Sequence, residues 1–317
     1  MRTLTRLMAA AVAALAAAAA AQDYPAKPVR IVTTPVASGG DIIAREMAAV
    51  MAGPLGAPIV VENRPALAAI ELVAKSPPDG YTILINGSVI WIQPLLQKTT
   101  PWDAVRDFTP ITLLARSPNL LVVTPSVPAK SVQELIALAR AKPGSLSYAS
   151  AGPGSSSQLA AELFKSMAGG LNIVHVPYKG AGPAMVDLME GRVQIGFVVT
   201  ASVIGQVKTG KLRPLAITSR EPSILAEGMP TVAESGLPGY ESVLMLGAFA
   251  PAGTSPAIVE RLHREMVRVL ANPGMKQKLI ASGAEVVGGT GEELLAAGKA
   301  DVVRWRKVIT EAHITLD

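Results

Sequence analysis

The chain contains no cysteine, which excludes several kinds of site. Disulfides, thiolate metal centres and a lipid anchor carried by a cysteine all require that residue. Three histidines are present, and His175, His263 and His313 are too far apart in sequence for a metal-ligand spacing. The acidic residues form no recognisable metal motif either. We therefore expect no metal and no cofactor.

Charge of one sign and aromatic residues are also scarce. The formal net charge is only +5 over 317 residues, the basic residues form no run, and aromatics make up 4% of the chain. Such a balance gives no basis for nucleic-acid binding. Half of the residues are hydrophobic, so a full core can be buried, and the length suits two domains better than one.

The N-terminus has the pattern of an export signal. Arg2 and Arg6 precede a short apolar stretch and an alanine run, and small residues precede Gln22. This pattern predicts a signal peptide over residues 1–21, cleaved near Ala21 and Gln22, and hence a periplasmic protein that is not a lipoprotein. The apolar part is too short and too rich in alanine for a stable membrane span, and no other stretch reaches that length.

After this segment, short β-branched runs alternate with helical stretches, which favours parallel sheets with helices on both faces. Strands are expected at 29–33, 59–63, 81–86, 120–124, 146–149, 173–176, 193–199, 215–218, 247–250 and 285–287. Helices are expected from Asp41, near 66–75, at 131–140 and 158–167, before 190, and at 256–270, 273–282 and 292–311.

Two glycine-containing loops, 35–40 and 150–157, each follow a strand and open a helix. Such loops lie at the carboxyl end of a sheet, where open α/β folds bind ligands. Backbone N–H groups at a helix N-terminus, together with the hydroxyls of Ser38, Ser155 and Ser156, could hold an anion there. The alternative is a plain turn in which serine caps the helix, and it stays open for each loop taken alone.

Signals for catalysis are weak. The second loop has Ser157 where a dinucleotide fingerprint needs its third glycine, and no Gly-Lys-Ser/Thr follows it. There is no Gly-x-Ser-x-Gly elbow, and each histidine is expected to be packed or solvated. Ser155 or Ser156 within reach of His175 would favour a hydrolase instead. Asp187 could face a cleft or could be a surface carboxylate on a helix.

Several motifs in order resemble the Bug family, the solute receptors of tripartite tricarboxylate transporters, over essentially all of residues 24–317. They are YPxKPxRIV at 24–32, the loop at 35–41, VENRP at 61–65, PDGYT at 78–82, SAGxGS at 150–155, LAxELF at 159–164, VPYKGxGPA at 176–184, GKLR at 210–213, PTVAESG at 230–236 and APAGT at 250–254.

This resemblance implies an α/β, type II periplasmic-binding-protein fold, with two lobes, a ligand cleft between them and a crossed hinge. The lobes would be residues 22–124 with 248–317, and residues 125–247. It further implies a monomeric, non-enzymatic receptor that closes on a small carboxylate and hands it to a membrane permease. The ligand-binding residues it implies are Ala37, Ser38, Gly39, Gly40, Asp41, Ser88, Ser150, Gly152, Gly154, Ser155, Ser156, Tyr178, Asp187 and Val198.

The chain departs from the family pattern at four places. Gly40 directly precedes Asp41, whereas the family usually has two residues between, and Ala66–Ala69 stands for a glycine-rich stretch in a segment about three residues short. Gln158 stands for a common histidine, and Val198 ends a segment that has lost two carboxylates. The loss of polar groups near Val198, with Leu244 and Met245 at a cleft segment of the family, favours an aromatic or branched monocarboxylate over a tricarboxylate. A signalling receptor on the same fold, and a receptor with degraded binding, remain alternatives.

Overall fold

The computed structural model describes residues 24–36 and 38–316, so the predicted signal peptide and Ala37 lie outside the described residues. The elements alternate as the sequence indicates. In chain order they are β1 (Val29–Thr33), α2 (Gly39–Leu55), β2 (Ile59–Asn63), α3 (Ala66–Ala74), β3 (Thr82–Gly87), α4 (Val89–Leu96), β4 (Phe108–Val123), α5 (Val132–Ala141), β5 (Ser147–Ser150), α6 (Ser156–Met167), β6 (Val174–Pro177), α7 (Ala181–Met189), β7 (Ile195–Val199), α8 (Thr200–Lys208), β8 (Arg213–Ile217), η1 (Ile224–Ala226), β9 (Val243–Pro251), α9 (Pro256–Leu270), α10 (Pro273–Ala281), β10 (Glu285–Thr290) and α11 (Gly291–Glu311).

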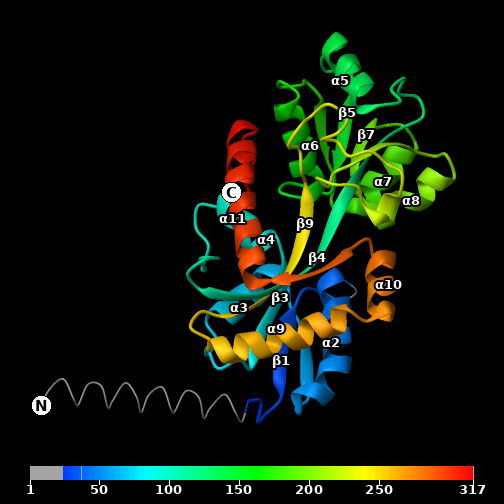
Figure 1. The fold of residues 1–317 in the computed structure, drawn as a ribbon. Coiled ribbons are helices and arrows are strands. Elements are labelled where there is room, and N and C mark those ends of the chain that lie inside the picture. The colour runs from blue at the N-terminus through cyan, green and yellow to red at the C-terminus, as the bar shows by residue number, and fades with distance from the viewer. Residues whose placement is uncertain (1–23, 37, 317) are drawn as a thin grey trace, which may run out of the picture.

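The strands pair into a curled mixed sheet in the order β2-β1-β3-β9-β4-β7-β5-β6, with β8 and β10 also paired to β4. At one end β1 is parallel to β2 and β3, and at the other β5 is parallel to β6 and β7. Figure 1 shows two groups of helices, one around each parallel set, with β4 and β9 running between them. The α/β fold expected from the sequence is confirmed.

Strand β4 joins the two parts of the sheet. Its first residues, from Phe108 to Pro118, pair with β9, and those from Asn119 to Val123 pair with β7 and β8. The sequence predicted only 120–124 as strand, because Pro110 and Pro118 interrupt the apolar run. Pro110 sits where the register with β9 shifts, and Pro118 lies where β4 changes partners, positions where a missing backbone donor is tolerated.

Two helices, α4 and α8, were missed because each begins immediately after a strand with no separate turn signal. Other element ends follow their local chemistry. Ser131 caps α5 by accepting a hydrogen bond from the N–H of Glu134. Serine followed three residues later by glutamate is the pattern of a capping box, but the Glu134 carboxylate accepts from the N–H of Lys130 rather than that of Ser131.

The buried residues form separate clusters on the two parts of the sheet. The cluster around α6 includes Leu159, Phe164 and Phe197, and residues from the second half of α11, such as Trp305 and Val308, pack into it. Figure 1 accordingly shows α11 extending from the lower group of helices to the side of α6. In the described part of the chain, no helix has both the length and the apolar character that a membrane span needs.

Candidate functional site

A cavity of about 330 Å³ lies where β5 and β7 end and where α6, α7 and α8 begin. Its lining combines hydroxyl groups with an apolar wall and contains no charged side chain. The lining residues are Asn119, Ala149, Ser150, Ala151, Ser156, Ser157, Ala181, Gly182, Ala184, Met185, Leu188, Gly196, Phe197, Val198, Val199 and Ser202. Carboxyl ends of parallel strands are the expected place for a ligand in such a fold.

The amino-terminal turns of three helices meet at this cavity. Ser156 and Ser157 open α6, Ala181 and Gly182 open α7, and Ser202 lies in the first turn of α8. The first N–H groups of a helix have no acceptor within the helix, and the helix dipole makes that end partially positive. The cavity can therefore stabilise an anion through backbone amides and hydroxyls without any basic side chain.

The second glycine loop is held mainly by its own hydrogen bonds. Ser155 caps α6, and its hydroxyl donates to the carbonyl of Gly152 over 2.6 Å. The N–H of Ala151 donates to Ser157, and that of Gly154 donates to Gln158. Gly152 has a φ of 123°, which a side chain would rarely adopt, so it serves the turn. Neither glycine lines the cavity, and the predicted Ser155 does not line it either, whereas Ser156 and Ser157 do.

Ser150, at the end of β5, contacts a histidine that the sequence did not single out as functional. Its Oγ lies 2.7 Å from Nε2 of His175, whose ring stacks on Tyr148 with the ring centroids 4.7 Å apart. Burial lowers the pKa of His175, although the charge of Glu162 opposes this effect. Neither Ser155 nor Ser156 is the serine in reach, because Nε2 of His175 contacts Ser150.

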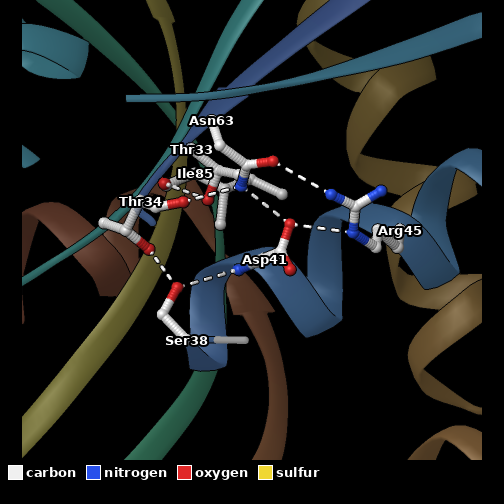
Figure 2. A network of polar contacts seen from close by, with 7 residues as sticks. All are labelled: Thr33, Thr34, Ser38, Asp41, Arg45, Asn63 and Ile85. Atoms are coloured by element: carbon white, nitrogen blue, oxygen red, sulfur yellow. Dashed lines mark hydrogen bonds and ion pairs between the residues drawn. The ribbon is translucent and has the colours of Figure 1, made fainter. Parts of the chain in front are cut away.

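The first loop forms a closed polar network at the start of α2 (Figure 2). The side chain of Asp41 is only 4% exposed and accepts from Asn63 over 2.7 Å, while its Oδ1 lies 2.9 Å from Nε of Arg45. Asn63 also donates to the carbonyl of Thr34, and Ser38 caps the helix by accepting from the N–H of Asp41. This network fixes the loop to β1 and β2.

Gly40 is required by close packing in the same loop. A Cβ at this position would lie 2.6 Å from Oγ1 of Thr34 and 2.8 Å from Oγ1 of Thr33. A Cβ on Gly39 would meet Leu246 of β9 at 3.3 Å. The predicted binding residues of this loop that the structure describes, Ser38 to Asp41, do not line the 330 Å³ cavity.

Three other predicted site residues also lie outside that lining. Ser88 is buried and its hydroxyl accepts from the N–H of Met245. Tyr178 donates from its hydroxyl to Asp187 over 2.8 Å, and burial followed by this hydrogen bond raises the pKa of Tyr178 to about 12. The hydrogen bonds from Tyr178 and Arg192 hold the pKa of Asp187 below its usual value.

Of the predicted set, Ser150, Ser156 and Val198 line the cavity. Sequence reasoning missed Ser157, Ala181, Gly182 and Ser202, and it also missed the apolar residues Met185 and Phe197. A signal for Ser157, Ala181 and Gly182 was available, because they lie in or next to the glycine-containing loops that follow the predicted strands 146–149 and 173–176. Ser202 had no such signal, since α8 was not predicted.

A second cavity, of about 510 Å³, has the opposite character and lies between β4, β9 and α11. Charged residues such as Arg116, Glu241 and Asp301 line it, together with Met245. Arg304 bridges Asp301 and Glu241 at 2.7 Å and 2.8 Å. Burial raises the pKa of Asp301 to about 6, although Arg304 opposes this effect. These ion pairs fasten α11 to the chain entering β9.

Comparison with known proteins identifies the chain. The family model described as the tripartite tricarboxylate transporter family receptor matches residues 43–314. The chain belongs to this receptor family. The protein BugT of Bordetella pertussis (strain Tohama I) is 33% identical over 324 residues, with 99% of each chain covered. The Bug resemblance of the sequence is thereby confirmed.

Two solved structures share the receptor's fold. Rpa4515 of R. palustris with adipate has 36% identity and a TM-score of 0.75, covering 92% of this chain and 99% of that one. MatC (Rpa3494) from Rhodopseudomonas palustris with bound malate has 28% identity and a TM-score of 0.69, covering 90% and 100%. Both relatives hold small carboxylates.

Proposed function

We propose that this receptor captures a small carboxylate by closing two lobes around it and delivers it, in the periplasm, to a tripartite tricarboxylate-type permease. The observation that carries the proposal is the uncharged cavity at which the first turns of α6, α7 and α8 meet. Helix N-termini favour anions, and an uncharged lining gives no competing carboxylate. Membership of the receptor family supports a binding role without covalent chemistry.

The lobes that we propose are residues 22–124 with 248–317, and residues 125–247. The change of partners along β4 at Asn119, just before the first limit, supports this division. All residues lining the cavity except Asn119 lie between 149 and 202, so the second lobe would make most of the contacts with the ligand before closure. The ligand then stabilises the closed state only through contacts that the open state lacks.

The chemistry of the wall favours an aromatic or branched monocarboxylate. Met185, Leu188, Phe197 and Val198 supply apolar surface beside the hydroxyls of Ser150 and Ser156. Such a wall offers no partner to the additional carboxylates of a compact tricarboxylate such as citrate, and burying an unpaired charge is costly. An apolar ligand body gains about 25 cal/mol for each Å² that it buries.

Equilibrium titration tests this ligand class directly. Adipate, citrate, glutamate and a series of benzoate-type acids would be titrated into the purified protein by calorimetry. We expect a benzoate-type acid to bind more tightly than citrate, and tight citrate binding would overturn the ligand assignment. Native mass spectrometry of protein purified from its own periplasm would identify a retained solute independently.

Substitution of Val198 provides a matched test of the apolar wall. Val198→Asp places a carboxylate in the cavity, so we expect at least a tenfold loss of affinity for a monocarboxylate through charge repulsion. Val186→Asp is the control, because Val186 is 44% exposed on α7 and does not line the cavity. Equal losses of affinity in both variants would contradict the placement of the site.

A further inference from the structure

Ser150 connects the ligand cavity to a titratable side chain outside it. Ser150 lines the 330 Å³ cavity, and its Oγ lies 2.7 Å from Nε2 of His175. His175 lines a separate groove of about 680 Å³ that also contains Glu162, Lys165 and residues of α11. A change of protonation on His175 can therefore reach the ligand site through one hydroxyl.

The hydroxyl of Ser150 has a single proton, and its possible acceptors are few. Its Oγ already accepts a hydrogen bond from the N–H of Gly152 at 3.2 Å, and the carbonyl of Gly152 lies at the long distance of 3.5 Å. If Nε2 of His175 is bare, the hydroxyl proton goes to it and Oγ turns a lone pair toward the cavity. If Nε2 carries a proton, it donates to Oγ, and the hydroxyl proton is free to face the cavity.

We propose that His175 is a positioning residue which, by donating from Nε2 to Ser150, makes the Ser150 hydroxyl a donor to the ligand carboxylate. This inference rests on the proposed function. A carboxylate accepts hydrogen bonds and offers none, so only the second arrangement satisfies it. By linkage, a bound carboxylate then favours the protonated Nε2 to the same extent that this proton favours the carboxylate.

The surroundings of His175 allow it to respond to pH. The ring stacks on Tyr148, whose hydroxyl donates to Glu162 at 2.5 Å, and Glu162 also pairs with Lys165 at 2.8 Å. Lys307 and Glu311 of α11 line the same groove. These four groups carry two positive and two negative charges, which offset one another. A carboxylate bound in the cavity adds one negative charge, and this added charge raises the pKa of His175 on binding.

The first test is the protonation of the ring itself, with adipate as the probe. Long-range ¹H–¹⁵N NMR separates the two tautomers and the imidazolium form, and the variants His263→Gln and His313→Gln assign the other two rings. We expect Nε2 of His175 to be protonated in the adipate complex. A bare Nε2 in the complex would overturn the proposal.

The second test follows affinity for adipate in matched variants. His175→Leu removes the donor, and we expect it to weaken binding about tenfold to a hundredfold, as for a hydrogen bond to a charged group. His175→Gln keeps an N–H donor and restores most of the affinity. In the Ser150→Ala background, His175→Leu has no further effect beyond about twofold, because the intermediary hydroxyl is gone. Additive losses would show a merely structural role for His175.

The pH profile separates positioning from packing. Affinity of the wild type for adipate falls as pH rises between about 5.5 and 8.5, because the imidazolium always carries the Nε2 proton, whereas the neutral ring must first adopt the Nε2–H tautomer. Dividing the wild-type affinity by the His175→Gln affinity at each pH removes the effect of the titration of adipate itself. If this ratio does not change with pH and His175→Leu binds adipate as tightly as the wild type, the role of His175 is wrong, although the receptor still binds a carboxylate. If no carboxylate binds, both the proposed function and the role of His175 are wrong.

A catalytic role of the serine–histidine pair is tested with p-nitrophenyl acetate. If the protein hydrolyses this ester and Ser150→Ala does not, the pair is catalytic and His175 is not a positioning residue.

Discussion

Gly40 illustrates how a residue in a glycine loop can serve packing alone. A methyl group at Gly40 would lie within 2.8 Å of two hydroxyl oxygens, that of Thr33, which donates to the carbonyl of Ile85, and that of Thr34, which contacts Ser38. We expect Gly40→Ala to lower the free energy of unfolding by roughly 1–3 kcal/mol, as overpacking commonly does. Urea denaturation measures this directly.

The matched control lies in the interior of α8. A Cβ on Gly205 would meet nothing within 4 Å, so Gly205→Ala should raise the free energy of unfolding by about 0.5–1 kcal/mol through helix propensity. Equal effects of the two substitutions would mean that the contacts of Gly40 with the threonine hydroxyls are unimportant.

Asp301 provides a pH-dependent test of burial at the residue scale. Its pKa is about 6 in the folded chain and 3.8 when exposed, because burial disfavours the carboxylate. Since the folded state binds this proton more tightly, its destabilising effect is absent below pH 3.8 and develops as pH rises to 6. We expect Asp301→Asn to gain roughly 3 kcal/mol relative to wild type between pH 4 and pH 7.

Asp107 supplies a control of opposite sign for the same denaturation series. The hydrogen bond from Arg106 lowers the pKa of Asp107, so its stabilising contribution is present near neutral pH and is lost as pH falls through the folded-state pKa. Asp107→Asn should therefore become less stable relative to wild type on the neutral side. A pH-independent difference for Asp301→Asn would contradict its assignment as a buried, perturbed carboxylate.

At the scale of elements, helix capping by serine could be predicted from the sequence, whereas the contacts that the two loops make with other strands could not. Ser38, Ser131 and Ser155 each cap the helix that follows them, the role left open for the serines of the two loops. The sequence did not reveal that Asp41 would be enclosed by Asn63 and Arg45, because these contacts depend on the parallel pairing of β1 with β2. Likewise, Ser150 meets His175 only because β5 and β6 are neighbours in the sheet.

Two serine caps make a matched pair for the second loop. Ser155→Ala and Ser131→Ala each remove a capping hydrogen bond and should each cost about 1 kcal/mol of unfolding free energy. Only Ser155→Ala also releases the carbonyl of Gly152 beside the cavity, so only this variant should weaken adipate binding. Calorimetric titration together with thermal denaturation distinguishes the two effects, and an equal loss of affinity in Ser131→Ala would contradict the assignment.

At the scale of the whole molecule, the position of the cavity sets a requirement for closure. Apart from Asn119, its lining comes from residues 149–202, and the first loop is already engaged in its own network at β1 and β2. A ligand held by one lobe gains further contacts only when the other lobe moves toward it. We therefore expect saturating adipate to reduce the radius of gyration in small-angle X-ray scattering.

Binding and closure are separable in this experiment, because ligand binding alone also stabilises the protein. Adipate at a hundred times its Kd should raise the unfolding free energy by about 2.7 kcal/mol, whether or not the lobes move. Val198→Asp provides the control in which both signals should be lost together. A rise in Tm with an unchanged radius of gyration would show that the ligand is held by one lobe alone, and the capture of the ligand between two lobes would then be wrong.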